Sequence, residues 1–98
     1  MVKITQDDAQ CAHVASILKA LGHPLRLRIV AHLDEQELHV GALAEALDVA
    51  QAAVSQQLSI LRMKHLVERS HRDGRAYYRL AEPRLHQLLS CMQDCKVR

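Results

Sequence analysis

Hydrophobic residues recur at helical spacing over most of the chain, and the pattern is clearest between Val40 and Met63. Apolar positions three and four residues apart predict one short helix over residues 40–47 and a second over residues 51–63. Residues 48–50 between them are too few to form anything but a turn. This stretch is therefore predicted to be two helices joined by a tight turn, around which the rest of the chain is organised.

The outward side of the second of these helices carries polar and mostly uncharged side chains. Gln51, Ser55 and Ser59 follow one helical face, with Gln56 beside them and Arg62 at the end. Such a face can enter the major groove of DNA, where Gln and Ser read base edges and Arg binds guanine or phosphate. A helix that merely faces solvent usually carries Lys and Glu, so this composition favours DNA contact. The candidate DNA-contacting residues of this helix are Gln51, Ala52, Ser55, Gln56, Gln57 and Arg62.

The hydrophobic period changes from helical to alternating after residue 65. Residues 66–72 and 75–80 form two predicted extended runs, with Asp73-Gly74 between them. This dipeptide is a strong hairpin signal because both central residues of the turn need positive φ. Arg72 and Arg75 are expected at its tip, where they can hold the DNA backbone. A hairpin that only improves solubility is the alternative, but its position directly after the paired helices favours a wing that contacts DNA.

Two further helices are predicted before this unit and one after it. The first spans about residues 6–21, and the second begins at Pro24 and ends near residue 32 or 33. Residues 34–37 are predicted to be a loop, and the last helix is predicted to run from near Pro83 to the end of the chain. The first and last helices are apolar but lie outside the DNA-reading unit, so we assign them to a dimer interface.

The expected fold is mainly α-helical with one small β-hairpin: four helices, then the hairpin, then a fifth helix. This order is that of a winged helix-turn-helix, here expected to be a homodimer through the first and fifth helices. Residues 1–98 are predicted to be one domain, because a chain of 98 residues buries one modest core. Hydrophobic residues make up 49% and aromatic residues 2%, so the core must come from aliphatic side chains, which suits packed helices.

Charge is unevenly distributed along the chain, although the formal net charge is only +2. Residues 34–48 contain five acids and no Lys or Arg, whereas residues 49–80 contain six bases and two acids. The positive segment coincides with the second of the paired helices and the hairpin. This is the footprint expected of a surface that contacts DNA phosphates.

Several classes of protein are disfavoured by what the sequence lacks. No apolar run approaches the ~18 residues of a membrane span, and the chain begins with no basic-then-apolar signal peptide. Three cysteines are an odd number without the spacing of a disulfide scaffold, which indicates a cytoplasmic protein with reduced thiols. The sequence shows no arrangement typical of a Ser–His–Asp catalytic triad, no paired carboxylates in an evident cleft and no phosphate-binding loop. We therefore expect no membrane partner and no enzymatic activity.

Over nearly its whole length the chain resembles the ArsR/SmtB family of bacterial winged-helix repressors. The matching stretches are residues 18–29, 43–47, 53–62, 66–67 and 73–80. Their order and spacing together are highly specific. The resemblance implies a homodimer joined by the first and fifth helices, a DNA operator with dyad symmetry, and release from DNA when an inducer binds.

The positions at which the chain departs from the family pattern bear on the inducer. Arsenic, cadmium and lead sensors of the family often carry Cys-Val-Cys where this chain has residues 39–41, His-Val-Gly. Zinc, cobalt and nickel sensors place Asp and His where this chain has Glu82 and Arg84, and a late His near Cys95, so that site is incomplete. The persulfide- and redox-sensing branch uses one Cys in the second helix and one in the fifth. Cys95 matches the latter position, but Ala31 stands at the former.

Cys11, Cys91 and Cys95 remain as the candidate sensing residues. Cys91 and Cys95 are four residues apart, so on a continuous helix they share one face. Three thiolates between the first and fifth helices suit trivalent arsenic, trivalent antimony or another thiophilic metal ion. Alternatively, two of these thiols could react with an oxidant or a persulfide and become joined to each other by a disulfide or polysulfide bridge. A third possibility is that all three cysteines are small buried hydrophobic residues.

The expected function is therefore that of a dimeric DNA-binding repressor whose operator affinity is switched by thiol chemistry. An alternative from another class is a thiol metal-binding protein, such as a buffer or chaperone, without operator binding. The polar helix face and the basic hairpin argue against that alternative.

Overall fold

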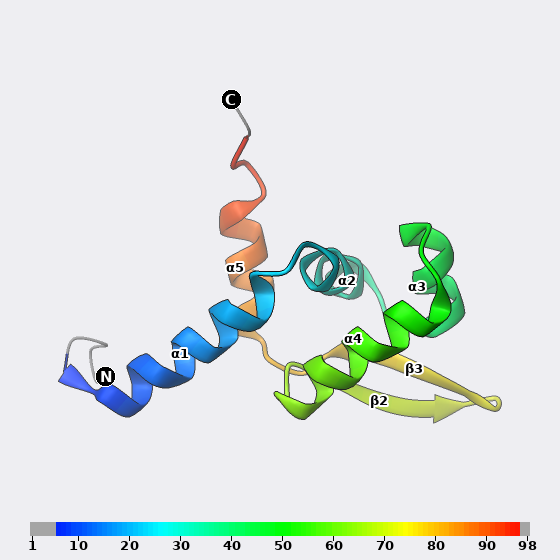
Figure 1. Ribbon diagram of the computed structural model, residues 1–98, viewed down its shortest axis with the longest axis horizontal. Coiled ribbons are helices and arrows are strands. Elements are labelled where there is room, and N and C mark those ends of the chain that lie inside the picture. Colours follow the sequence, from blue (N-terminus) through cyan, green and yellow to red (C-terminus); the bar gives the residue numbers. More distant parts are fainter. Residues whose placement is uncertain (1–5, 97–98) are drawn as a thin grey trace.

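The computed structural model describes residues 6–96 as five helices and three short strands. In chain order these are α1 (Asp8–Leu21), α2 (Pro24–Glu35), β1 (Leu38–His39), α3 (Val40–Leu47), α4 (Gln51–Met63), β2 (Val67–Arg72), β3 (Arg75–Leu80) and α5 (Arg84–Met92). Helices α2, α3 and α4 pack with the sheet into the body of the molecule, and α1 and α5 project from one end of it (Figure 1). No helix in this part of the chain is long and apolar enough to cross a membrane.

The hydrophobic core lies where α2, α3, α4 and the sheet meet. Its largest fully buried side chains are Ile29, Val30, Leu43, Val54, Leu58, Leu61, Val67 and Leu85. Three of them, Val54, Leu58 and Leu61, form the apolar stripe predicted for α4. Because burial of apolar surface is the main stabilising term in folding, this stripe fixes which side of α4 faces the core. The opposite side of α4 consequently faces solvent.

Helix α2 extends to Glu35, so the prediction of a loop from residue 34 is wrong for its first two residues. The backbone N–H of Gln36 donates to the carbonyl of His32 (3.3 Å) and closes the last turn. The carboxylate of Asp34 lies 2.8 Å from Nδ1 of His86 and holds the acidic end of α2 against α5. A contact between residues so far apart in the chain leaves no local pattern that could have predicted it.

The hairpin of β2 and β3, called the wing from here on, forms as predicted around Asp73 and Gly74. Their φ angles are 53° and 77°, the positive values that the turn requires. A third strand, β1, pairs antiparallel with the other edge of β3 and places Leu38 opposite Tyr78. A strand of two residues shows too little alternation to be predicted, so β1 is recognised only through its pairing.

Helix α5 ends at Met92 and not at the end of the chain as predicted. The backbone N–H of Cys95 donates to the carbonyl of Met92 (2.9 Å) in a turn that follows the helix. After Met92 the described chain has only polar residues and Cys95, so no apolar stripe continues the helix. Cys91 therefore lies in the last turn of α5 and Cys95 beyond it, and the two thiols do not share a helical face as expected.

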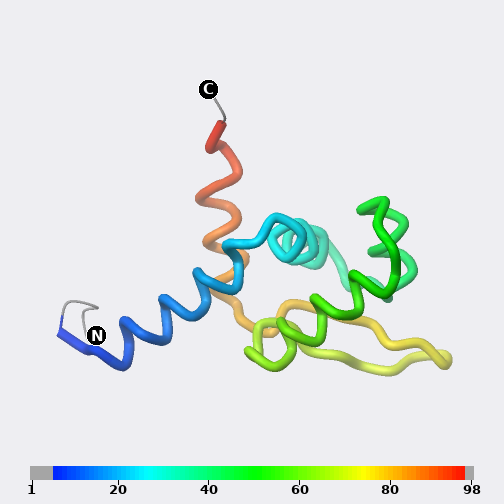
Figure 2. Tube along the Cα trace, in the orientation of Figure 1, coloured from blue at the N-terminus to red at the C-terminus, as the bar shows by residue number. Residues whose placement is uncertain are grey.

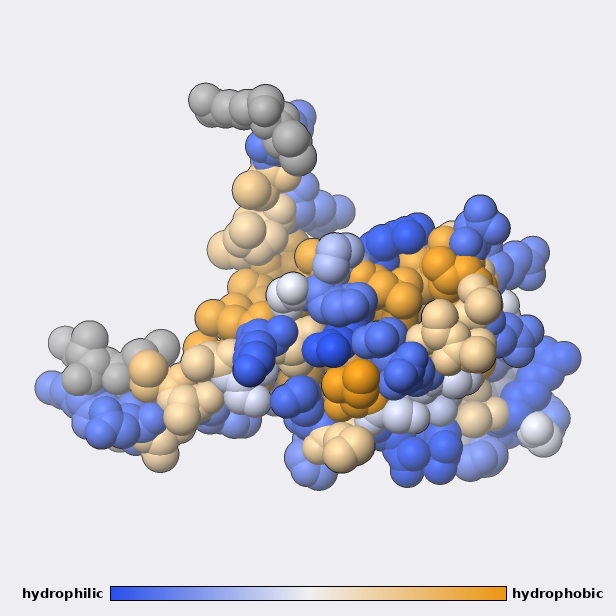
Figure 3. Space-filling model, viewed as in Figure 1, coloured by the Kyte–Doolittle hydropathy of each residue, from blue (hydrophilic) through white to orange (hydrophobic). Residues whose placement is uncertain are grey.

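Helices α1 and α5 leave apolar side chains exposed. Leu18 on α1 and Met92 on α5 have exposed fractions of 52% and 55%. A hollow of about 160 Å³ between the two helices is lined mainly by apolar side chains, among them Ile17 and Leu88. Figure 3 shows hydrophobic surface in orange where the two helices diverge. This part of the surface is apolar enough to be covered by another chain.

Candidate nucleic-acid interface

The turn between α3 and α4 fixes the direction in which α4 leaves α3. Asp48 has a φ of 56°, in the left-handed region that Asp tolerates better than most residues. The N–H of Val49 donates to the carbonyl of Ala44 (3.1 Å) and closes the end of α3. Arg28 of α2 donates to the carbonyl of Leu47 (3.3 Å) and holds the same end from outside. Together these contacts set α4 at one angle to the body.

The exposed side of α4 is the one predicted to read DNA. Its exposed residues include Gln51, Ala52, Ser55, Gln56, Ser59 and Arg62. The N-cap residue, Ala50, provides no side-chain hydrogen bond, so the first N–H groups of α4 lack a side-chain partner. Unpaired N–H groups at a helix N-terminus bind anions such as phosphate. This side of α4 thus offers hydrogen-bonding groups of both the backbone and the side chains.

Gln57, also predicted as a DNA contact, does not lie on this exposed side. It is half-buried, and its Oε1 accepts a hydrogen bond from Nε of Arg26 on α2 (2.7 Å). The same guanidinium donates through Nη1 to the carbonyl of Ala20 near the end of α1 (3.3 Å). Arg26 therefore joins α1, α2 and α4 at one point, called the Arg26 junction from here on. The side-chain oxygen of Gln57 is occupied within the protein.

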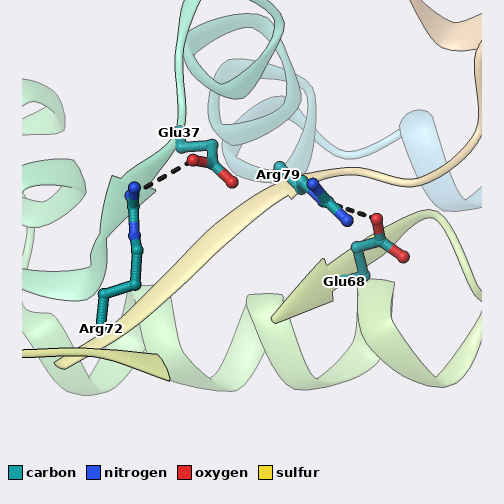
Figure 4. Close-up of polar contacts among 4 residues, drawn as sticks. All are labelled: Glu37, Glu68, Arg72 and Arg79. Carbon is teal, nitrogen blue, oxygen red and sulfur yellow. Dashed lines mark hydrogen bonds and ion pairs between the residues drawn. The ribbon is translucent and has the colours of Figure 1, made fainter. Parts of the chain in front are cut away.

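The two arginines predicted at the tip of the wing lie there, and both contact the segment that contains β1. Nη2 of Arg72 lies 3.2 Å from Oε2 of Glu37 (Figure 4). The guanidinium carbon of Arg72 lies 4.2 Å from the centre of the Tyr77 ring. Nη1 of Arg75 lies 3.2 Å from Nε2 of His39. Both arginines remain exposed, so a phosphate that approaches the wing can reach them.

His39 connects the start of α3 with the wing. Its Nδ1 accepts a hydrogen bond from the backbone N–H of Ala42 (3.2 Å), and its ring meets Tyr77 edge to face at a centroid distance of 5.6 Å. A cavity of about 330 Å³ beside His39 is bounded by the first residues of α3 and α4 and by Arg75. The sequence did not single out Glu37 or Tyr77, because their contacts join segments that are distant in the chain and carry no shared motif.

The three cysteines are exposed and unbridged, which does not fit the alternative that they are buried hydrophobes of the protomer. Cys11 lies near the start of α1, whereas Cys91 lies in the last turn of α5 and Cys95 follows the helix. The outer end of α5 is well away from the start of α1 (Figure 2). Within residues 6–96, no group of three or more His, Cys, Asp or Glu side chains is placed to hold one metal ion. A single protomer therefore does not gather the three thiols.

The positions that correspond to the early ligands of zinc-type sensors are also unsuited to a metal. Nε of Arg84 lies 3.1 Å from Oε1 of Glu82, so these two side chains pair with each other. A guanidinium has no lone pair to offer a cation. The incomplete site expected from the sequence is thus occupied by an ion pair between its own residues.

Known proteins resemble this chain over most of its length. Residues 23–69 match the family described as bacterial regulatory protein, arsR family. A biofilm growth-associated repressor of Xylella fastidiosa is 36% identical over 91 residues, which cover 91% of this chain and 80% of the repressor. The solved structure described as reduced HlyU from Vibrio cholerae has a TM-score of 0.84 and 28% identity, over 91% of this chain and 96% of that one.

A further solved structure bears on the fold and on assembly. The homodimeric winged helix-turn-helix DNA-binding domain of Mb0332 from Mycobacterium bovis has a TM-score of 0.78 and 30% identity, over 95% of this chain and 84% of that one. The mainly helical winged-helix fold expected from the sequence is thereby confirmed.

Proposed function

The chain belongs to the arsR family of bacterial regulatory proteins, and on that basis we propose that it is a homodimeric repressor that leaves its operator when an inducer reacts with its thiols. Proteins of this family regulate transcription and are not enzymes, as the sequence predicts. The proposal has three parts: DNA contact by α4 and the wing, pairing of two chains through α1 and α5, and inducer chemistry at the cysteines. The bacterial cytoplasm, where the chromosome lies, is the proposed place of action.

The observation that carries the DNA-binding part is the exposed polar side of α4 with the basic wing beside it. An α-helix fits the major groove, and Gln and Ser side chains can pair with base edges there. The buried stripe and the Arg26 junction hold α4 from behind, so its outer side is presented in one orientation. In this proposal Gln51, Ala52, Ser55 and Gln56 contact bases, Arg62 contacts guanine or phosphate, and Arg72 and Arg75 contact phosphates.

Replacing Gln56 with alanine is expected to weaken operator binding about tenfold or more and to change binding to a random duplex little. Contacts to bases distinguish one DNA sequence from another, whereas contacts to phosphates do not. Loss of the Gln56 amide should therefore mainly reduce the preference of the protein for its operator over other sequences. Fluorescence anisotropy on an operator selected from a random pool by the wild-type protein, and on a scrambled duplex, gives both Kd values. The variant Gln36→Ala, at an exposed position just after α2, is the matched control. An unchanged operator Kd for Gln56→Ala would place the reading face elsewhere.

The dimer part of the proposal rests on the apolar surface that α1 and α5 expose. Two chains that cover these surfaces for each other form a two-fold dimer, and such a dimer presents two copies of α4. Helix-turn-helix dimers bind half-sites about 34–36 Å apart, so that each α4 meets one of two successive major grooves. An operator with dyad symmetry follows from that arrangement.

The inducer part rests on three accessible thiols. Thiolates are preferred ligands of soft ions, and three of them suit trivalent arsenic or antimony. Because one protomer does not gather its thiols, we propose that Cys11 of one chain meets Cys91 and Cys95 of the other at the interface of α1 and α5. A ligand held there acts on the relative position of the two chains. It can release DNA only if it binds the released arrangement more tightly than the DNA-bound one.

A bridge between two thiols is the second candidate for the switch. Its formation transfers two electrons from the thiols to an oxidant or a persulfide, and both thiol protons leave. The observation that favours it is the similarity to HlyU, whose structure is described in a reduced form. In this version Cys95 pairs with Cys11 or Cys91, and no metal ion is needed.

The variants Cys11→Ser, Cys91→Ser and Cys95→Ser are expected to bind the operator as wild type does, because these exposed thiols lie outside α4 and the wing. Release by the inducer is expected to need Cys95 and at least one of the other two. Operator-bound fraction is measured by anisotropy while arsenite or polysulfide is added. If arsenite releases the protein from DNA and protects all three thiols from alkylation, the result supports a metalloid as the inducer. A two-thiol bridge with polysulfide, and no arsenite effect, supports the redox switch. A triple Ser variant that still responds excludes both.

A further inference from the structure

We propose that Glu37 occupies the phosphate-binding position of Arg72 in the free protein and thereby lowers its affinity for all DNA. The inference rests on the proposed function, in that it takes the wing to contact the DNA backbone. In this proposal Glu37, which lies outside the wing, limits how strongly the wing attracts DNA.

The geometry of Arg72 carries the first step. Arg72 is the last residue of β2, and Glu37 precedes β1 on the far side of β3, since the strand order is β1-β3-β2. The side chain of Arg72 reaches across the sheet and brings Nη2 within 3.2 Å of the Glu37 carboxylate (Figure 4). Its guanidinium carbon lies 4.2 Å from the centre of the Tyr77 ring on β3. Its guanidinium therefore lies along the sheet and does not extend beyond the tip of the wing.

The chemistry of the pair carries the second step. Carboxylate and phosphate oxygens bind guanidinium through the same charge-assisted hydrogen bonds. A phosphate that approaches Arg72 must take the place of Glu37, whose own charge repels it. The side chains of Arg72 and Glu37 are 54% and 34% exposed, so solvent screens the pair and it can be exchanged. The contact therefore reduces the attraction of DNA without preventing it.

A comparison with the other acid–arginine pair of the wing carries the third step. Glu68 and Arg79 are direct cross-strand partners, and Oε1 of Glu68 lies 2.6 Å from Nε of Arg79. The sheet itself places that pair together, at the end of the wing nearer the body. Glu37, by contrast, reaches Arg72 from a different segment, so Arg72 is held at the tip of the wing by an acid that lies outside it.

Salt dependence separates this effect from a change in the number of phosphate contacts. Each phosphate that a protein cation neutralises releases counterions condensed on the DNA, and the slope of log K against log salt steepens by about 0.9. Arg72 meets the same phosphate in the wild type and in Glu37→Gln, so the two slopes should be nearly equal. Arg72→Gln loses that contact, so its slope should be shallower by about one.

The test measures the affinity of Glu37→Gln for the selected operator and for random duplex at several salt concentrations. We expect threefold to tenfold tighter binding of Glu37→Gln to both duplexes near physiological salt, with little change in the slope. Glu35→Gln removes the same charge from the exposed end of α2 and is the matched control, expected to show a smaller effect. In the Arg72→Gln background, Glu37→Gln should tighten binding only by the smaller factor seen for Glu35→Gln, since the rest of its effect acts through Arg72.

Three outcomes would overturn the inference. Glu37→Gln could bind DNA no more tightly than Glu35→Gln, Arg72→Gln could keep the salt slope of the wild type, or Glu37→Gln could tighten binding by the same factor when Arg72 is absent. Circular dichroism and the Tm of each variant establish that the wing remains folded, and Glu37→Asp, which is shorter, provides a second way to weaken the pair. A wild-type protein that binds no duplex would instead refute the proposed function, so the two failures are distinguishable.

Discussion

Replacing Leu18 with glutamate is expected to give folded monomers in place of the proposed dimer, and these should bind the operator roughly 100-fold or more weakly. Leu18 is 52% exposed in the protomer, whereas α1 is anchored to the body by its buried last residues, Ala20 and Leu21. The substitution therefore spares the core but buries an unpaired charge in the interface, at a cost of several kcal/mol (about 3–5). A monomer loses the linkage between half-sites that makes the second contact intramolecular.

The measurement for this variant is the mass in solution, by light scattering after size exclusion, together with the operator Kd. Met63→Glu is the matched control, because Met63 is 80% exposed at the end of α4 and lies outside α1 and α5. It should leave the mass unchanged. A Leu18→Glu protein that remains a dimer would show that α1 does not contribute to the interface.

The second large effect is expected from Leu58→Ala, with a loss of about 2–5 kcal/mol in the free energy of unfolding. Leu58 is fully buried in the middle of the stripe that fixes α4, so the truncation leaves a cavity behind α4. Domains of this kind have about 5–15 kcal/mol of stability in total, and the loss is a large part of it.

Urea unfolding at a fixed protomer concentration measures this loss, because the stability of a dimer depends on concentration. Ser59→Ala is the control at the next residue, which is exposed, and it should change stability by less than about 0.5 kcal/mol. Leu58→Met keeps most of the volume and should cost less than about 1.5 kcal/mol. A Leu58→Ala protein within about 1 kcal/mol of the wild type would mean that the core does not depend on this stripe.

The helix-turn-helix could be predicted to the residue, because its signals are local. The apolar stripes of residues 40–47 and 51–63 coincide with α3 and α4, and Asp73-Gly74 forms the turn that its composition requires. Hydrophobic periodicity and the residue preferences of turns both depend on residues that are close together in the chain, so both can be read from a single sequence.

The parts that could not be predicted depend on contacts between distant segments. The sequence alone places Gln57 next to Gln56 as an equivalent polar residue, yet Arg26, 31 residues earlier, draws it away from the exposed side. The ion pair of Arg72 with Glu37 and the pairing of β1 with β3 likewise join segments that are distant in the chain. The prediction for α5 is too long because no glycine or proline marks the end of the helix, although the apolar stripe stops at Met92. The inducer, the dyad operator and the one-domain organisation of residues 1–98 stay predictions.

The Arg26 junction divides α4 into positions that can be redesigned and positions that cannot. Exposed residues such as Ser55 and Gln56 can be randomised in a library that seeks regulators for new operator sequences, since the protein does not depend on their side chains for packing. Gln57 must be kept fixed, because its loss would leave the half-buried guanidinium of Arg26 without its closest acceptor. A library that randomises every polar residue of α4, Gln57 included, would therefore contain many variants of reduced stability.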